Sequence, residues 1–344
     1  MKYSIKQNKH LKVLRSEFVN YNFDKRTGLM ATWGRTQDED PVFSPVGPFI
    51  LDIEVSTICH RGCKFCYKGN TKNGTNMSLD NFKTILDKMP KALTQIAFGS
   101  GSQGIENPDL FAMMEYARSK EIIPNITVAD ISDETADRLS QLCGAVAVSR
   151  YADKNDCYNS VQKLVSRGMK QVNIHLMISK ETKEQAIETI KDYHSDPRLK
   201  GMNAIVFLSL KRKGRGEKFT PLTQEEFDEI VNLSFANNVS IGFDSCSQKK
   251  FIRAIKNHPD KDRLEMLTTS CESTCESSYI NTEGKFYACS FCEGGSSFPE
   301  GLDVLNCNDF LKDIWFNEKT VAWRSNLLES NKNPNNAGCP VFEV

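Results

Sequence analysis

The feature that most constrains this chain is a regular alternation of strand-like and helix-like segments between residues 48 and 243. Apolar, strand-like runs are separated by segments in which apolar residues recur with the period of an α-helix. Strands that alternate with helices form parallel βαβ units, because each helix returns the chain to the starting edge of the sheet. The strand-like runs are residues 49–55, 94–98, 122–128, 145–149, 171–178, 204–210 and 239–243.

The number of these units predicts the architecture. Six or seven of them favour an α/β fold, a partial (β/α)6 barrel of the TIM type, whose chemistry lies at the carboxyl ends of the strands. A doubly wound open sheet is the alternative, since strand order cannot be read from a sequence. Residues 1–47 predict an N-terminal extension with a β-hairpin, and residues 48–261 the barrel. Residues 262–344, where cysteines and short segments replace the alternation, predict a small Cys-rich α+β domain.

The charge balance excludes some classes of partner. Lys+Arg and Asp+Glu both number 44, so no global field recruits nucleic acid or an acidic membrane surface. No apolar stretch approaches the roughly 18 residues that a membrane-spanning helix needs, and no secretory signal is visible. We therefore expect a cytoplasmic protein with no membrane or nucleic-acid partner. Because disulfides are rare in that compartment, the 12 cysteines indicate metal ligands or catalytic thiols.

The first group of cysteines follows the first strand-like run. Cys59, Cys63 and Cys66 have the spacing C-x3-C-x2-C. Three thiolates on one loop can bind three irons of a cubane and leave the fourth iron free to chelate a small molecule. A helix with three core-facing cysteines fits poorly, because His, Arg, Gly and Lys lie between them, and a zinc site would need a fourth ligand such as His60. The spacing therefore favours a [4Fe–4S] cluster.

This motif, with an aromatic residue directly before its last cysteine, resembles the radical S-adenosylmethionine (radical SAM) superfamily. The resemblance implies that the three cysteines bind a [4Fe–4S] cluster whose open iron chelates S-adenosylmethionine. It implies further that one electron, supplied by an external reductant such as flavodoxin or ferredoxin, cleaves this cofactor. The products are methionine and a 5′-deoxyadenosyl radical, which takes hydrogen from a substrate. By position, Phe65 matches the family's aromatic residue near the adenine, and Tyr67 flanks the same site.

The loop after the second strand is similar to the family's Gly-Gly-Glu-Pro loop, which holds the methionine amino group. Gly99, Ser100, Gly101 and Ser102 occupy this place. The pattern departs from the family where no Glu directly follows the glycines. Ser102 itself and Glu106, further along the loop, are the candidates for the missing role.

Further site residues are expected at the ends of later strands. Ser149 and Arg150 match the family's fourth strand, whose polar residues reach the ribose and the carboxylate of the cofactor, and Arg pairs bidentately with carboxylates. His175 and Asp244 are candidates for substrate contacts. Cys246 follows a strand end directly and is a candidate catalytic thiol or radical relay at the barrel mouth.

The second group of cysteines lies in the C-terminal region. Four thiolates from separate segments suit a closed tetrahedral site or a fully ligated cubane. The Gly-x4-Cys pattern ending at Cys289 resembles the SPASM/Twitch extension of radical SAM enzymes, truncated to one auxiliary [4Fe–4S] cluster. The predicted ligands are Cys271, Cys275, Cys289 and Cys339, with Cys292 as the substitute for either of the last two. Structural zinc is the alternative.

The resemblance also orders the possible functions. Members with such extensions often modify peptides, so maturase-type modification of a peptide or protein side chain is the leading hypothesis. Residues 1–47 are too few for the winged-helix element with which many maturases grip a leader peptide, so a separate partner or a leaderless substrate is expected. A small metabolite such as a sugar or nucleoside is the second hypothesis. A non-catalytic iron–sulfur or zinc scaffold is the third.

Overall fold

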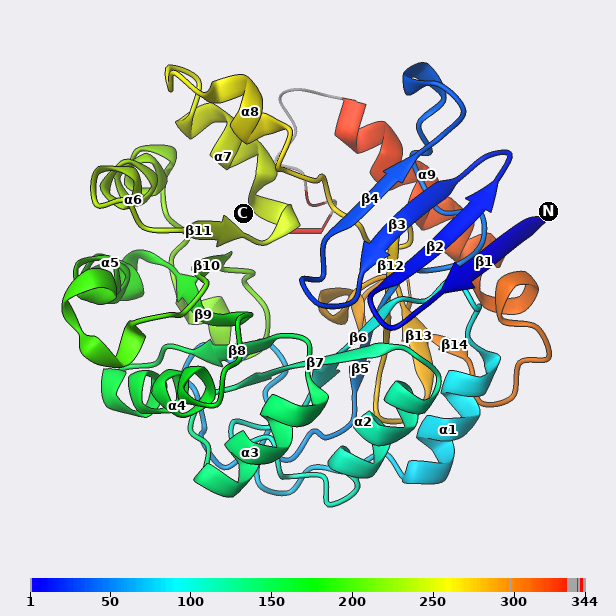
Figure 1. Cartoon of the computed structure of the whole chain (residues 1–344), viewed down its shortest axis with the longest axis horizontal. Helices are drawn as coiled ribbons and strands as arrows, with labels where there is room; N and C mark the ends of the chain where they lie inside the picture. The colour runs from blue at the N-terminus through cyan, green and yellow to red at the C-terminus, as the bar shows by residue number, and fades with distance from the viewer. Residues whose placement is uncertain (1, 297, 333–338, 340, 343–344) are drawn as a thin grey trace.

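A curved sheet of parallel strands, with helices along its outer side, forms the centre of the molecule (Figure 1). The computed structural model describes residues 2–296, 298–332, 339 and 341–342. Within them, consecutive strands pair in parallel and in chain order, so each βα unit adds a strand beside the previous one. These strands are β5 (Ile50–Glu54), β6 (Gln95–Gly99), β7 (Ile123–Val128), β8 (Val146–Ser149), β9 (Val172–Ile178), β10 (Ala204–Ser209) and β11 (Ile241–Phe243).

The helices between these strands begin at the polar caps that the sequence provides. The Ser78 hydroxyl accepts a hydrogen bond from the N–H of Asn81, and Thr223 forms a capping box with Glu226. Both caps satisfy amide groups that would otherwise lack partners in the first helical turn. The helices are α1 (Leu79–Lys88), α2 (Leu110–Ser119), α3 (Asp133–Leu142), α4 (Lys154–Ser166), α5 (Lys183–Ser195) and α6 (Gln224–Ala236).

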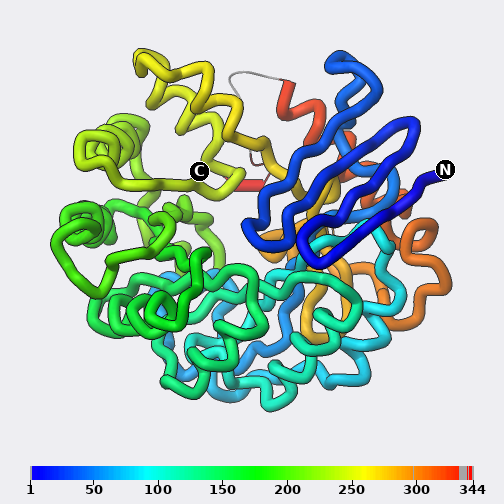
Figure 2. Tube along the Cα trace, in the orientation of Figure 1, coloured from blue at the N-terminus to red at the C-terminus, as the bar shows by residue number. Residues whose placement is uncertain are grey.

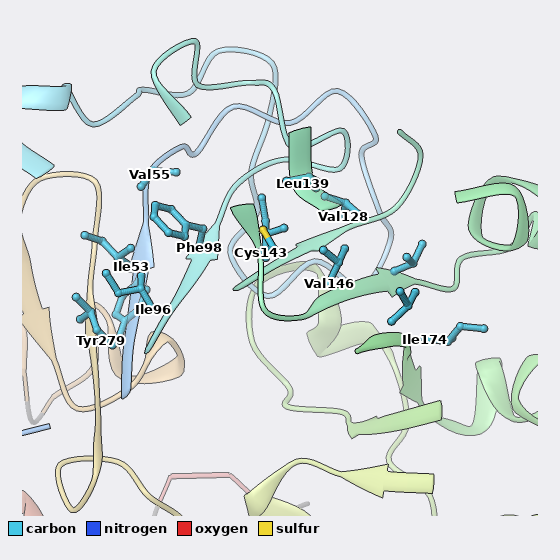
Figure 3. Close-up of a cluster of buried hydrophobic side chains, with 14 of the residues drawn as sticks. Ile53, Val55, Ile96, Phe98, Val128, Leu139, Cys143, Val146, Ile174 and Tyr279 are labelled. Atoms are coloured by element: carbon cyan, nitrogen blue, oxygen red, sulfur yellow. The ribbon is translucent and has the colours of Figure 1, made fainter. Parts of the chain in front are cut away.

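The outer face of the sheet is apolar and packs under the helices. Ile53, Ile96, Phe98 and Val146 belong to one continuous buried cluster with the apolar residues of the helices (Figure 3). Side chains along a strand alternate between the two faces of a sheet, so these residues fix which face is the inner one.

The inner face carries small and polar side chains. Asp52, Ala97, Ala147, Asn173 and His175 alternate with the outward-facing apolar residues of their strands. A complete TIM barrel fills its interior with bulky branched residues. Here the interior has room for ligands beside the carboxyl ends of the strands.

The C-terminal region continues the barrel sheet. Strand β12 (Ser277–Ile280) pairs in parallel with β5, and the strands β13 (Lys285–Tyr287) and β14 (Leu302–Asp303) follow in antiparallel order. Within the described residues the sheet therefore has ten strands, with β11 at one edge and β14 at the other. The predicted α/β partial barrel with a Cys-rich α+β C-terminus is confirmed.

Three further helices lie in the C-terminal part of the described chain. Helices α7 (Gln248–Ala254) and α8 (Lys261–Glu265) lead from β11 toward β12, and α9 (Glu318–Lys332) follows the hairpin. Figure 2 shows the described C-terminal residues, in red, beside the end of β11. No helix among the described ranges is both long enough and apolar enough to cross a membrane.

The N-terminal residues form a separate antiparallel sheet of consecutive strands. The rings of Tyr21 and Phe49 lie 5.2 Å apart, and Tyr21 also donates a hydrogen bond to the carbonyl of Ala92. Phe49 and Ala92 precede β5 and β6, so this sheet covers the amino ends of the barrel strands, away from their carboxyl ends. Its strands are β1 (Tyr3–Gln7), β2 (Leu11–Ser16), β3 (Asn20–Asp24) and β4 (Met30–Trp33).

Candidate active site and auxiliary metal centre

The first cysteine group lies on the loop that leaves the carboxyl end of β5. Burial, and then the nearby thiols of Cys59 and Cys66, raise the pKa of Cys63, so the three sulfurs lie close together. The Tyr151 hydroxyl donates a hydrogen bond to the Cys63 thiol. The N–H of Cys59 donates to the carbonyl of Thr71 at 2.9 Å, which holds the loop against the following segment.

The loop after β10 packs directly on the cysteine loop. The Arg215 Nε atom donates to the Cys63 carbonyl at 2.8 Å, and the Arg215 N–H donates to the Cys66 carbonyl at 3.1 Å. Gly214 has a φ of +56°, and a Cβ there would lie 2.5 Å from the Tyr67 carbonyl oxygen. Only glycine allows both this conformation and this approach. The sixth barrel strand therefore helps to set the positions of the thiols.

Glu106 supplies a carboxylate to the glycine loop after β6. Its oxygens accept hydrogen bonds from the N–H of Gln103 at 3.0 Å and of Ile105 at 3.1 Å. A Cβ on Gly101 would lie 2.2 Å from Glu106 Oε1 and 2.6 Å from the Ile58 carbonyl oxygen. The carboxylate thus folds back over the glycine, next to the backbone that precedes Cys59.

The other residues of this loop have supporting contacts. The Gly99 carbonyl accepts a hydrogen bond from the Val55 N–H, and the Ser100 hydroxyl donates to Glu106 at 3.5 Å. Ser102 contributes its backbone carbonyl to the N–H of Ala129 at 2.6 Å. Glu106 is thus the candidate whose carboxylate contacts this loop, whereas the contact made by Ser102 comes from its backbone.

The two aromatic residues around Cys66 face different partners. Phe65 packs against Tyr151, with ring centroids 5.7 Å apart, and so lies beside Cys63. Tyr67 stacks with Phe291 at 4.2 Å, and its hydroxyl donates to Ser290 at 3.0 Å. Phe65 therefore stays beside the first cysteine group, whereas Tyr67 connects the cysteine loop to the C-terminal region.

The residues predicted at the ends of β8 and β9 differ in what they contact. Ser149 donates to the Tyr151 hydroxyl and so lies one contact from the first thiol group. The Arg150 guanidinium is ion-paired with Glu188 at 2.6 Å, while its buried Nε and Nη1 atoms have no partner in the described structure. His175 lies on the inner face, where burial lowers its pKa to about 4.

Thiols of the second group line one cavity of about 240 Å³ inside the barrel. Cys275 does not line this cavity, because its side chain is buried beside the Arg324 guanidinium. Burial raises the pKa of the Cys275 thiol, and the positive charge of Arg324 partly opposes this effect. Cys246, at the end of β11, does line the cavity, although the sequence predicted a catalytic role for this residue. The described cysteines around the cavity are Cys246, Cys271, Cys289, Cys292 and Cys339.

These thiols contact one another. The Cys246 thiol lies within hydrogen-bond reach of both Cys271 and Cys339. Donation of its single proton to either sulfur raises the pKa of Cys246 and lowers the pKa of Cys271 and Cys339. The sulfurs of Cys289 and Cys292 lie 3.3 Å apart. Side chains from both edges of the barrel sheet therefore meet in one place.

A buried lysine lies against the same thiols. Lys211 is ion-paired with Asp244, which also accepts a hydrogen bond from Ser247. Asp244 is thus occupied by neighbouring side chains. The thiols whose charge favours the Lys211 ammonium are those of Cys246, Cys271, Cys289 and Cys339.

Polar contacts at the carboxyl end of β5 connect the two cysteine groups. Lys68 follows the cysteine loop and is ion-paired with Glu54 at 3.1 Å and with Glu293, just beyond Cys292. The Lys68 ammonium also donates to the Tyr279 hydroxyl at 2.7 Å. These residues, with Tyr67 and Ser290, link the loop of the first group to the hairpin loop of the second.

Both groups consist of thiols without other metal-binding side chains among their predicted ligands. Across the described ranges, no three His, Cys, Asp or Glu side chains are arranged to hold one metal ion. The all-sulfur character of both groups matches the ligands that iron–sulfur clusters use.

Some residues of the site were not predicted from the sequence. These are Tyr151, Lys211 and, as a candidate metal ligand, Cys246. Their positions could have identified them, because each lies within three residues of the carboxyl end of a barrel strand, where the chemistry of such barrels occurs.

No protein-family model matches the chain, and no curated protein matches it in sequence. Solved structures do match. Streptococcus suis SuiB bound to S-adenosylmethionine aligns with a TM-score of 0.63 over 87% of this chain and 78% of that one, at 13% identity. SuiB bound to its precursor peptide SuiA aligns with a TM-score of 0.69 over 99% and 100%, at 11% identity. The chain has the fold of SuiB. The predicted resemblance to radical SAM enzymes is thereby confirmed at the level of the fold.

Proposed function

We propose that the chain is a radical SAM enzyme that uses a cluster on Cys59, Cys63 and Cys66 to generate a radical from S-adenosylmethionine. The observation that carries this proposal is that the three cysteines lie on one loop at the carboxyl end of β5, next to which the Glu106 carboxylate folds over Gly101 beside the Ile58 carbonyl. The SuiB fold, solved with S-adenosylmethionine bound, supports the same function.

The chain's own residues hold and orient the cofactor. When bound, the cluster and S-adenosylmethionine supply a 5′-deoxyadenosyl radical that takes a hydrogen atom from the substrate. Three thiolates from one loop leave one iron open for the cofactor. The Glu106 carboxylate would accept hydrogen bonds from the methionine ammonium group, and Phe65 would pack near the adenine. The Tyr151 hydroxyl donates to the Cys63 thiol, and Ser149 donates to Tyr151.

The proposed substrate is a peptide or protein side chain. Its support is the likeness to SuiB bound to a precursor peptide, which extends over nearly the whole chain. The residues Ala97 and Ala147 on the inner face have small side chains, as a barrel that admits a substrate segment would need. We propose a flavodoxin- or ferredoxin-like protein as the electron donor.

The proposal is tested by anaerobic reconstitution with iron and sulfide, followed by addition of dithionite and S-adenosylmethionine. We expect 5′-deoxyadenosine to form, and we expect Cys63→Ala to abolish its formation. Cys143→Ala is the matched control, because this buried cysteine lies at the end of α3, outside both thiol groups. Intact clusters without cofactor cleavage, with candidate substrates present, would leave a non-catalytic iron–sulfur protein in place of the enzyme.

A further inference from the structure

We infer that the auxiliary cluster is ligated by Cys246, Cys271, Cys289 and Cys339, so that a barrel cysteine takes the place of Cys275. The inference goes beyond the proposed function, which needs only the first cluster, and assumes a second cluster on the thiols of the cavity. Its consequence is that the iron centre joins the two edges of the open barrel.

The first observation is the cavity itself. Cys246 lines it together with Cys271 and Cys339, and the Cys246 thiol is in hydrogen-bond contact with both. Cys275 lies four residues after Cys271, but its side chain is buried outside the cavity, beside Arg324. A ligand must present its sulfur to the common cavity, and Cys275 does not.

The second observation distinguishes Cys292 from the four proposed ligands. Lys211 has a nearly buried ammonium group, and the thiols that interact with its charge are the four proposed ligands. Cys292 lies near Lys213, as Cys289 also does, but Cys292 is the more deeply buried of the two and belongs to the apolar core of the barrel and hairpin. A cubane needs four thiolates, and a nearby positive charge offsets part of their mutual repulsion.

The ligands come from opposite edges of the sheet. Cys246 follows β11, the last strand on one side, whereas Cys271 precedes β12 and Cys289 follows β13 on the other. No hydrogen-bonded ladder joins β11 to these strands among the described residues. Metal–thiolate bonds would therefore close a seam that the backbone leaves open.

The experiment isolates the second cluster by removing the ligands of the first. In a Cys59→Ala, Cys63→Ala, Cys66→Ala background, iron and sulfide are counted after anaerobic reconstitution, and Mössbauer spectra are recorded. We expect about four irons per chain. Cys246→Ala should lower this to below one, whereas Cys275→Ala and Cys292→Ala should keep about four.

The opposite pattern, iron lost with Cys275→Ala or Cys292→Ala but kept with Cys246→Ala, would overturn the inference. One zinc and no iron in the background variant would do the same. Because Cys246→Ala could disturb folding, Cys246→Ser provides a second measurement. Serine preserves the size of the side chain, and we expect lost iron or an altered spectrum; an unchanged spectrum at full iron content contradicts the assignment. None of these outcomes depends on whether S-adenosylmethionine is cleaved.

Discussion

Glu106 illustrates, at the scale of single residues, how a carboxylate can reach a site from an unexpected position. The family pattern places a Glu directly after the glycines, and here Ser102 stands there. The loop turns back so that Glu106 lies over Gly101 instead. We expect Glu106→Gln to weaken S-adenosylmethionine binding by about 10- to 100-fold, the range of a charge-assisted hydrogen bond.

Equilibrium dialysis of the reconstituted protein measures this affinity. Asp109→Asn is the matched control, since this carboxylate lies three residues away and makes no capping hydrogen bond to α2. Equal affinities of the wild type and Glu106→Gln would remove Glu106 from the site.

Lys211 is expected to tune the auxiliary cluster. Its ammonium lies against the cavity thiols, and a nearby positive charge stabilises the more negative, reduced cluster. Lys211→Met should lower the one-electron reduction potential by on the order of 60 mV, a tenfold change in the equilibrium. Lys211→Arg keeps the positive charge and should have a reduction potential close to that of the wild type. A redox titration followed by electron paramagnetic resonance measures the potential, and equal potentials in wild type and Lys211→Met would contradict this role.

His175 makes stability depend on pH. Burial lowers its pKa to about 4 from the ordinary value of 6.5, so between these values the unfolded chain binds a proton that the folded chain does not. Its contribution is therefore lost as the pH falls through this window and regained as the pH rises, with a slope of at most about 1.4 kcal/mol per pH unit. His175→Gln should flatten the slope of urea-unfolding free energy between pH 4 and 6.5. Above pH 7 the wild type and His175→Gln should show the same dependence of unfolding free energy on pH.

At the scale of elements, the periodic sequence pattern predicted the strands of the barrel, but it did not predict which distant strands pair. The barrel strands lie within a few residues of their predicted positions, with helices between them, because periodic burial leaves a clear pattern. The parallel pairing of β12 with β5 joins segments more than 200 residues apart, and no local pattern reports it. For the same reason the sequence pattern predicted Cys275 as a ligand and did not predict that Cys246 would line the cavity with Cys271.

The contact between the cysteine loop and the C-terminal hairpin depends on Lys68. This ammonium lies between the carboxylates of Glu54 and Glu293, and removing it leaves the buried Glu54 unpaired. Breaking a buried pair by removing one partner costs about 3–5 kcal/mol. Lys68→Met should lower the free energy of unfolding by about 3 kcal/mol in urea titrations. Adding Glu54→Gln should recover part of this loss, and a change below about 0.5 kcal/mol would show that the contact is solvated.

At the scale of the whole molecule, the open barrel has one seam and the second thiol group lies across it. Removing a ligand of the auxiliary cluster should increase local opening of the strands beside the seam, and it should leave the strands on the opposite side of the barrel unchanged. In Cys246→Ala we expect faster amide hydrogen exchange in β11 and in β12, and unchanged exchange in β7. Mass spectrometry of exchanged peptides measures this. Faster exchange throughout the sheet would indicate general destabilisation instead.

A seam closed by iron also links the supply of the metal to the lifetime of the protein. The apo chain would keep β11 at a free sheet edge, where local opening exposes backbone to proteases. In a cell short of iron, the chain would then be degraded as well as inactive. Its abundance would follow the iron available at the time of folding, before any substrate is met.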